Sequence, residues 1–218
     1  MTRLRGDISI SLDGFVAGPN PSLEEPLGEG GDLLHEWALS AESWRESHGL
    51  AGGDKNADSE VIKESIVTTG AVVMGRRMFS GGEGAWENDA RARGWWGDDP
   101  PFHVPVFVLT HHPRETLVMQ GGTTFTYVTE GIEAAVDAAR STAGDKDVLV
   151  AGGASVVQQC LKAGLLDELQ IHIAPVLLGN GTSLFDRLEI EPLALEATRV
   201  LASPTVTHLR FRVPGRTA

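Results

Sequence analysis

The pattern of apolar and polar residues predicts strands near both ends of the chain. Residues 7–12 alternate between polar and apolar side chains, and the same period of two occurs at 168–174 and 209–213. Strict alternation is typical of a strand with one buried and one polar face. Residues 15–17 resume the first strand after a short interruption at Asp13-Gly14.

Three short, continuously apolar runs predict strands that are buried on both faces, at residues 71–74, 106–109 and 148–151. Segments in which apolar residues recur at helical spacing lie between the strands. The expected helices cover residues 33–44, 59–68, 132–139 and a segment directly after Gly153. We therefore predict one α/β domain over residues 1–218, with a sheet that is parallel in the middle and antiparallel toward its C-terminal edge.

Each of the three buried strands is followed by residues that suit an anion. Gly152-Gly153 follows the run at 148–151 and precedes a helix pattern, so unpaired backbone N–H groups are expected there. Glycine has no Cβ, and a phosphate can therefore approach these groups closely. Gly75-Arg76-Arg77 and Thr110-His111 follow the other two strands. The three strand ends together favour a nucleotide cofactor.

Composition narrows the possible partners and the compartment. The net charge is −12, from 18 basic and 30 acidic residues, which argues against sequence-independent nucleic-acid binding but leaves a local phosphate site open. No apolar run reaches the roughly 18 residues of a membrane span, and we see no signal peptide. The chain has 1 cysteine, Cys160, on the apolar side of its predicted helix, and we expect a buried thiol and a cytoplasmic protein.

Five motifs occur in an order that resembles a known family. They are Ser11-Leu12-Asp13-Gly14-Phe15-Val16-Ala17, Val73-Met74-Gly75-Arg76, Val108-Leu109-Thr110, Val150-Ala151-Gly152-Gly153, and Ile173-Ala174-Pro175-Val176-Leu177-Leu178-Gly179-Asn180-Gly181-Thr182. Together they resemble the dihydrofolate reductase-like superfamily. The nearest branch is the reductase domain of the riboflavin-biosynthesis deaminase/reductase, with its stand-alone bacterial relatives. The resemblance implies a three-layer α/β/α sandwich and reduction of a pteridine-like or pyrimidine substrate with NADPH.

The resemblance also implies a cofactor site. Gly75, Arg76 and Arg77 would begin a helix that holds the pyrophosphate, and Thr110 with His111 would face the adenosine 2′-phosphate. Gly152-Gly153 would form a turn that is often a cis peptide in the family. The remaining implied cofactor contacts are the N–H groups of Ala154, Ser155 and Val156 at the phosphate, and Val16 and Ala17 against the nicotinamide.

The proton donor is expected on the first helix, by analogy with the acid of folate reductases. Asp32 and Glu36 are the candidates, and Glu36 is preferred because it borders the apolar stripe, where burial would raise a carboxyl pKa. Trp37, beside it, is the expected substrate contact. The Trp-rich insert at 80–104 either walls a planar substrate or anchors a long loop, and we favour the anchor.

Several functions stay open at this point. The leading one is an NADPH-dependent reductase similar to 5-amino-6-(5-phosphoribosylamino)uracil reductase. Dihydrofolate reduction and a non-catalytic nucleotide-binding module are the alternatives. The deaminase zinc motif is missing. The adjacent His111-His112 pair lacks the spacing of metal ligands, so no metal is expected. The apolar segment at 173–178 could support a homodimer.

Overall fold

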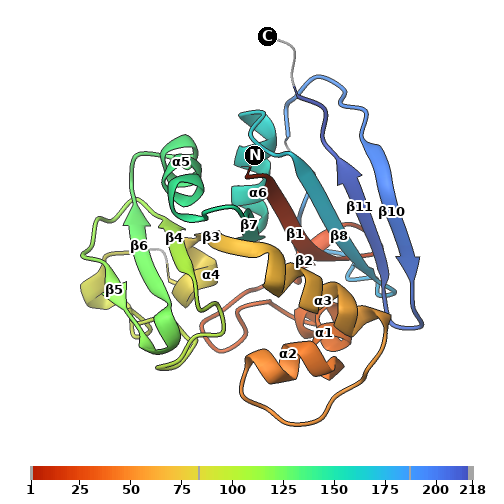
Figure 1. Cartoon of the computed structure of the whole chain (residues 1–218), viewed down its shortest axis with the longest axis horizontal. Helices are drawn as coiled ribbons and strands as arrows, with labels where there is room; N and C mark the ends of the chain where they lie inside the picture. Colours follow the sequence, from red (N-terminus) through yellow and green to blue (C-terminus); the bar gives the residue numbers. More distant parts are fainter. Residues whose placement is uncertain (1, 83, 187, 216–218) are drawn as a thin grey trace.

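The computed structural model describes residues 2–82, 84–186 and 188–215. A nine-stranded sheet runs through the molecule in the order β10-β11-β8-β1-β7-β3-β4-β6-β5, and β2 pairs with β9 in a second, small sheet (Figure 1). The strands are β1 (Leu4–Ser11), β2 (Phe15–Ala17), β3 (Thr69–Gly75), β4 (Pro105–Leu109), β5 (Leu117–Val118), β6 (Thr124–Val128), β7 (Asp147–Gly152), β8 (Glu168–Ala174), β9 (Thr182–Ser183), β10 (Glu196–Ala202) and β11 (Thr207–Arg212).

The middle of the large sheet is parallel, as predicted. Strand β1 pairs in parallel with both β7 and β8, and β3 pairs in parallel with β4 and β7. Strand β11 is antiparallel to β8 and to β10, which confirms the antiparallel C-terminal edge. A further antiparallel pair, β5 with β6, lies at the opposite edge.

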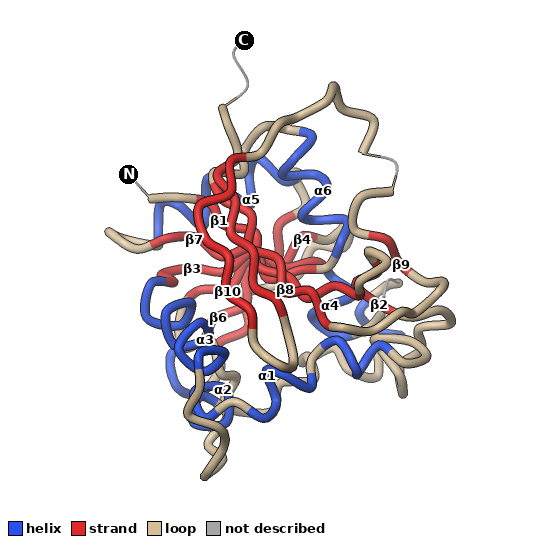
Figure 2. The backbone as a smooth tube through the Cα atoms, turned by 90° about the vertical axis from the view of Figure 1, so that its right-hand side faces the viewer, coloured by secondary structure: helices blue, strands red, loops and turns tan. Residues whose placement is uncertain are grey.

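Helices cover both faces of the sheet, which gives the three layers that the resemblance implied (Figure 2). Helices α5 and α6 pack with Ala71, Val73 and Val150 on one face, whereas α4 packs with Val72 and Met74 on the other. The helical segments are η1 (Gly31–Leu34), α1 (Glu36–Ser40), α2 (Glu42–Ser47), α3 (Ala57–Thr68), α4 (Arg76–Ser80), η2 (Trp86–Asn88), η3 (Gln120–Gly122), α5 (Ile132–Thr142) and α6 (Ala154–Lys162). None of the helices in the described ranges is long and apolar enough to span a membrane.

The predicted first helix is wrong in its continuity. Residues 33–44 form η1, α1 and the start of α2 rather than one helix. Ala41 is extended, with φ −70° and ψ 137°, and bridges to Asp54. Leu33, expected at the centre of the apolar stripe, is 43% exposed, and Leu34 is buried in its place.

Candidate active site

The ends of strands β3, β4 and β7 meet at one edge of the sheet. Gly75 at the end of β3 is level with Leu109 of β4, and Thr110 follows directly. A Cβ built on Gly75 would lie 3.8 Å from the amide nitrogen of Gly153 and 3.1 Å from Cγ2 of Val156. The glycine segments after β3 and β7 are therefore in contact, and Thr110 lies at the same edge.

The turn between β7 and α6 presents backbone N–H groups. The peptide bond between Gly152 and Gly153 is cis, and α6 begins at Ala154 without a side-chain cap. The Val156 amide donates to the Gly153 carbonyl at 3.0 Å, so the expected phosphate contact by this N–H is not supported. Within the described part of the chain, the amides of Ala154 and Ser155 have no acceptor. A Cβ at Gly153 would meet no atom within 4 Å, and the open space beside these donors fits a phosphate.

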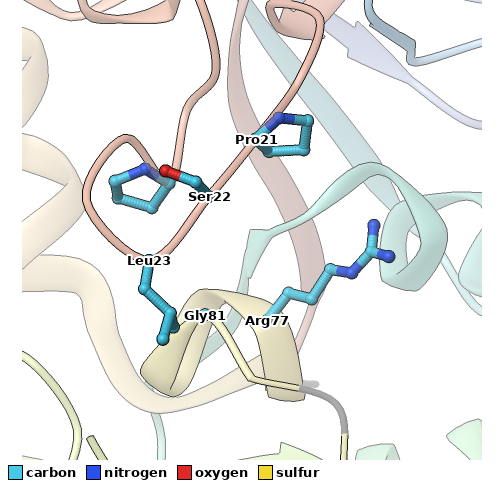
Figure 3. Close-up of a pocket in the computed structure, with 6 residues that line it drawn as sticks. Pro21, Ser22, Leu23, Arg77 and Gly81 are labelled. Atoms are coloured by element: carbon cyan, nitrogen blue, oxygen red, sulfur yellow. The ribbon is translucent and has the colours of Figure 1, made fainter. Parts of the chain in front are cut away.

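A cleft of about 370 Å³ adjoins this edge. The loop at 21–26 forms one wall, and Arg77 and Gly81 of the α4 segment form the other. Figure 3 shows the Arg77 side chain extending away from the α4 ribbon and from Leu23 and Gly81, with Pro21 and Ser22 on the facing loop. Arg77 is exposed and lines this cleft, and a guanidinium is a group that can bind an anion.

Arg76, the neighbouring arginine, points away from the cleft. Its side chain is 7% exposed, donates to Ser80 Oγ, and forms an ion pair with the Asp89 carboxylate. The guanidinium carbon lies 3.6 Å from the ring centroid of Trp86. The prediction that Arg76 grips the cofactor pyrophosphate is therefore wrong for the side chain, because an internal carboxylate already holds it.

Asp89 completes this buried network from the insert at 80–104. Burial raises the pKa of its carboxyl, but hydrogen bonds from Ser80 and Arg76 outweigh burial, and the pKa lies below its ordinary value. Trp86 of the insert donates from Nε1 to the His112 carbonyl at 3.0 Å. Trp86, Trp96 and Phe102 all pack against the aromatic core around Phe79. The insert is anchored by its aromatic residues, as we favoured.

Thr110 and His111 contribute differently to the strand ends. The Thr110 hydroxyl is buried and accepts a hydrogen bond from the His112 amide at 3.2 Å. Thr110 therefore shapes the turn after β4. His111 is exposed, and of the two it is the one whose side chain can reach a phosphate at this edge.

The candidates on the first helix lie at the surface, with one exception. Asp32 in η1 and Glu36 in α1 are both exposed, so the burial expected for Glu36 is not found. Trp37 is 5% exposed and donates from Nε1 to Ser9 Oγ at 3.1 Å. Trp37 is a core residue, and its burial replaces the expected contact with substrate.

The segment expected against the nicotinamide is held by Asp13. Val16 packs into the core and Ala17 is half-buried. Asp13 accepts hydrogen bonds from the amides of Leu178 and Gly179, at 3.1 and 2.7 Å. A hydrogen bond from the Ser11 hydroxyl lowers the pKa of the Asp13 carboxyl. Asp13 belongs to the first of the five motifs, but its contacts with Leu178 and Gly179 of the last motif are not predicted by the sequence.

A mostly parallel α/β sheet with antiparallel C-terminal strands and glycines at the carboxyl ends of β3 and β7 defines the class, a dihydrofolate reductase-like domain. The family model described as "RibD C-terminal domain" matches residues 4–209. The chain belongs to this family, whose members are reductases.

Solved structures share the fold at low identity. A protein named for riboflavin biosynthesis from Shewanella sp. PV-4 is 21% identical, with a TM-score of 0.63 over 98% of this chain and 99% of that one. RibD of Acinetobacter baumannii is 17% identical, with a TM-score of 0.57 over 98% of this chain and 58% of its own. A deaminase/reductase of Thermotoga maritima is 14% identical, with a TM-score of 0.55 over 98% of this chain and 57% of its own.

One curated relative matches in part. YwjB of Bacillus subtilis (strain 168) is 32% identical over 84 residues, which are 38% of this chain and 48% of YwjB. The matched part of the chain thus covers about half of the length of YwjB.

Proposed function

We propose that the protein is an NADPH-dependent reductase that passes hydride to a pteridine-like or ribosylamino-pyrimidine substrate. The proposal depends on the backbone amides of Ala154 and Ser155, which have no acceptor among the described residues and lie beside open space over Gly153. Arg77 lines the adjoining cleft. Backbone donors and a guanidinium are the groups that bind a pyrophosphate.

The residues at this edge fit a dinucleotide. The Ala154 and Ser155 amides and Arg77 would hold the pyrophosphate, His111 the adenosine end, and Ala17 the nicotinamide side. NADPH, when bound, supplies the hydride. The protein contributes position, because it holds the substrate and cofactor rigidly and keeps water from the reacting atoms.

The proton donor stays a proposal. Asp32 and Glu36 are exposed on the segment that follows Gly31, whose Cβ would lie 3.9 Å from the Ala17 Cα. This closeness to the nicotinamide side supports a donor on this segment. We propose Glu36 first and Asp32 second.

Two alternatives are separable by experiment. Dihydrofolate reduction predicts tight binding of methotrexate and oxidation of NADPH by dihydrofolate. A non-catalytic nucleotide-binding module predicts that NADPH binds but is oxidised by neither dihydrofolate nor a deaminated pyrimidine riboside.

The test is a titration of tryptophan fluorescence with NADPH and with NADH. We expect tighter binding of NADPH, weakened by high salt. Arg77→Gln removes a charge-assisted contact and should weaken the binding of NADPH by roughly tenfold or more. Arg93→Gln, which removes an exposed arginine of the insert, is the matched control and should bind as the wild type does. No response to either cofactor would refute the proposal.

A further inference from the structure

A buried pair of histidines lies on the sheet, away from the cofactor edge. His172 of β8 and His208 of β11 are opposite one another in register. Their Nδ1 atoms are 2.6 Å apart, and each residue is 3% exposed. The proposed reductase chemistry uses neither of them.

Each imidazole also contacts a carboxylate through its other nitrogen. His172 Nε2 lies 2.6 Å from Asp7 Oδ1, and His208 Nε2 lies 3.0 Å from Asp58 Oδ1. Asp58 also accepts hydrogen bonds from the hydroxyls of Ser203 and Thr205. Both carboxylates are therefore placed as hydrogen-bond acceptors.

Asp7 is held as an anion. Its other oxygen accepts hydrogen bonds from Ser65 and Gln170, each at 3.1 Å. Burial raises the pKa of the carboxyl, but His172 and Arg5 outweigh burial and lower it to about 2. The nitrogen of His172 that faces Asp7 must therefore carry a proton.

Counting protons fixes the state of the pair. Both Nε2 atoms face acceptors and carry hydrogen, whereas only one hydrogen fits between two Nδ1 atoms at 2.6 Å. Burial lowers the pKa of His208, and with the charge of the neighbouring ring it outweighs the hydrogen bond with Asp58, which raises the pKa. The two rings therefore carry one positive charge between them, with a single hydrogen shared by the two Nδ1 atoms.

Helix α1 rests on this pair through Trp37. The indole centroid lies 4.6 Å from the His172 ring and 5.0 Å from the His208 ring. A cation over an indole is attracted by the ring. Trp37 also donates to Ser9 of β1, so the pair and Ser9 together set where α1 meets the sheet.

We propose that His172 and His208 form a one-proton latch that positions Trp37, and with it helix α1, on the sheet. A second proton would turn two N–H groups against each other at the Nδ1 contact and loosen α1 from the sheet. That α1 borders the substrate rests on the proposed function, whereas the latch itself does not. The charged or titratable groups that face the pair are Asp7 and Arg5 of β1, Asp58 of α3, His35 before α1, and Arg210 of β11 with its partner Glu64.

The sign of the pH dependence follows from His208. Its pKa is lowered in the folded protein, so the unfolded chain takes up a proton first, near the ordinary histidine value of about 6.5. Stability supplied by the latch is thus present above this pH and is lost as the pH falls below it. The pKa of His35 is also lowered, and His35 therefore adds to the pH dependence of stability. The contribution of the latch is measured as the difference in stability between the wild type and a variant that lacks His208.

The experiment is nitrogen-15 NMR of the histidine side chains in the free protein. At pH 7.5 we expect one imidazolium and one neutral ring protonated at Nε2. In a pH series down to pH 5, the signals of both rings should change together with the indole N–H signal of Trp37. His208→Asn keeps an acceptor for His172 but cannot take a second proton. Below pH 6, the unfolding constant of the wild type should rise relative to this variant by up to about tenfold per pH unit.

His103→Asn is the matched control. His103 is exposed and has a positive φ of 50°, a conformation that asparagine adopts readily, so this variant should retain the wild-type pH dependence. Two neutral imidazoles at pH 7.5, or unchanged pH dependence in His208→Asn, would overturn the latch. If His208→Asn does not fold, the wild-type spectra alone decide. The cofactor is absent from all samples, so failure of NADPH binding leaves this test intact.

Discussion

Asp89→Ala tests the finding that Arg76 is a buried, internally paired residue. The Asp89 and Arg76 side chains are 4% and 7% exposed. Removing the carboxylate leaves the guanidinium buried without its counter-charge, since Trp86 covers it and Ser80 supplies only a hydroxyl. Loss of one partner from a buried ion pair costs about 3–5 kcal/mol.

Urea unfolding followed by tryptophan fluorescence measures this loss in the free energy of unfolding, and thermal unfolding measures the matching fall in Tm. In a chain of this length each kcal/mol lowers Tm by about 2–4 °C, so Asp89→Ala should lower Tm by roughly 6–20 °C. Asp99→Ala is the control, because the Asp99 side chain is 59% exposed and lies 3.7 Å from His103. An exposed pair of this kind contributes about 0–1 kcal/mol.

The double variant Arg76→Met/Asp89→Leu removes both charges together and should recover most of the lost stability. If Asp89→Ala lowered the free energy of unfolding no more than Asp99→Ala does, the Arg76 guanidinium would have to reach solvent or the cleft. The original expectation that Arg76 contacts the cofactor would then stand again.

Three further changes follow from the structure. Gly153→Ala adds a methyl group that meets no protein atom within 4 Å, so the free energy of unfolding should stay within about 0.5 kcal/mol of the wild type, as thermal unfolding would show. The methyl group would occupy the space proposed for the phosphate, and fluorescence titration should show NADPH affinity reduced at least tenfold. Cys160 is buried, and burial raises the pKa of its thiol to about 12, so at pH 8 it should react with Ellman's reagent only in urea; fast reaction in the native protein would contradict this placement. Leu177 is 70% exposed and follows Val176, whose carbonyl accepts a hydrogen bond from the amide of Leu12, itself 64% exposed. If this face joins two copies, Leu177→Glu should convert a dimer to a monomer in sedimentation velocity. A monomeric wild type would refute the dimer.

The central strands could be predicted because burial on both faces leaves a clear sequence pattern. Strand β3 is buried along most of its length, and residues 71–74 within it form the continuous apolar run from which it was predicted. Strand β10 (Glu196–Ala202) was not predicted, because it is largely exposed on both faces and so has no alternation to detect. The break at Ala41 was also missed, since it depends on pairing with the distant Asp54.

The parts of the candidate site that the backbone forms could be predicted from the sequence. Gly75 and Gly153 follow apolar runs that are typical of buried parallel strands. This local pattern was enough to predict that the two glycines lie at the same edge of the sheet. The direction of the Arg76 side chain could not be predicted, because Asp89 lies 13 residues away in an insert of irregular structure. Trp37 was misplaced for a similar reason: its partners, His172 and His208, come from the far end of the chain.

The most direct test of a cofactor site at the strand ends is nitrogen-15 amide NMR of the protein titrated with NADPH. The largest shifts should fall on the amides of Ala154 and Ser155 and around Arg77, and in Gly153→Ala they should need at least tenfold more NADPH. If the largest shifts fell instead at the opposite end of the sheet, around Lys63 and Phe102, where a second cleft lies, or if no amide moved at millimolar NADPH, the proposed cofactor site would be wrong.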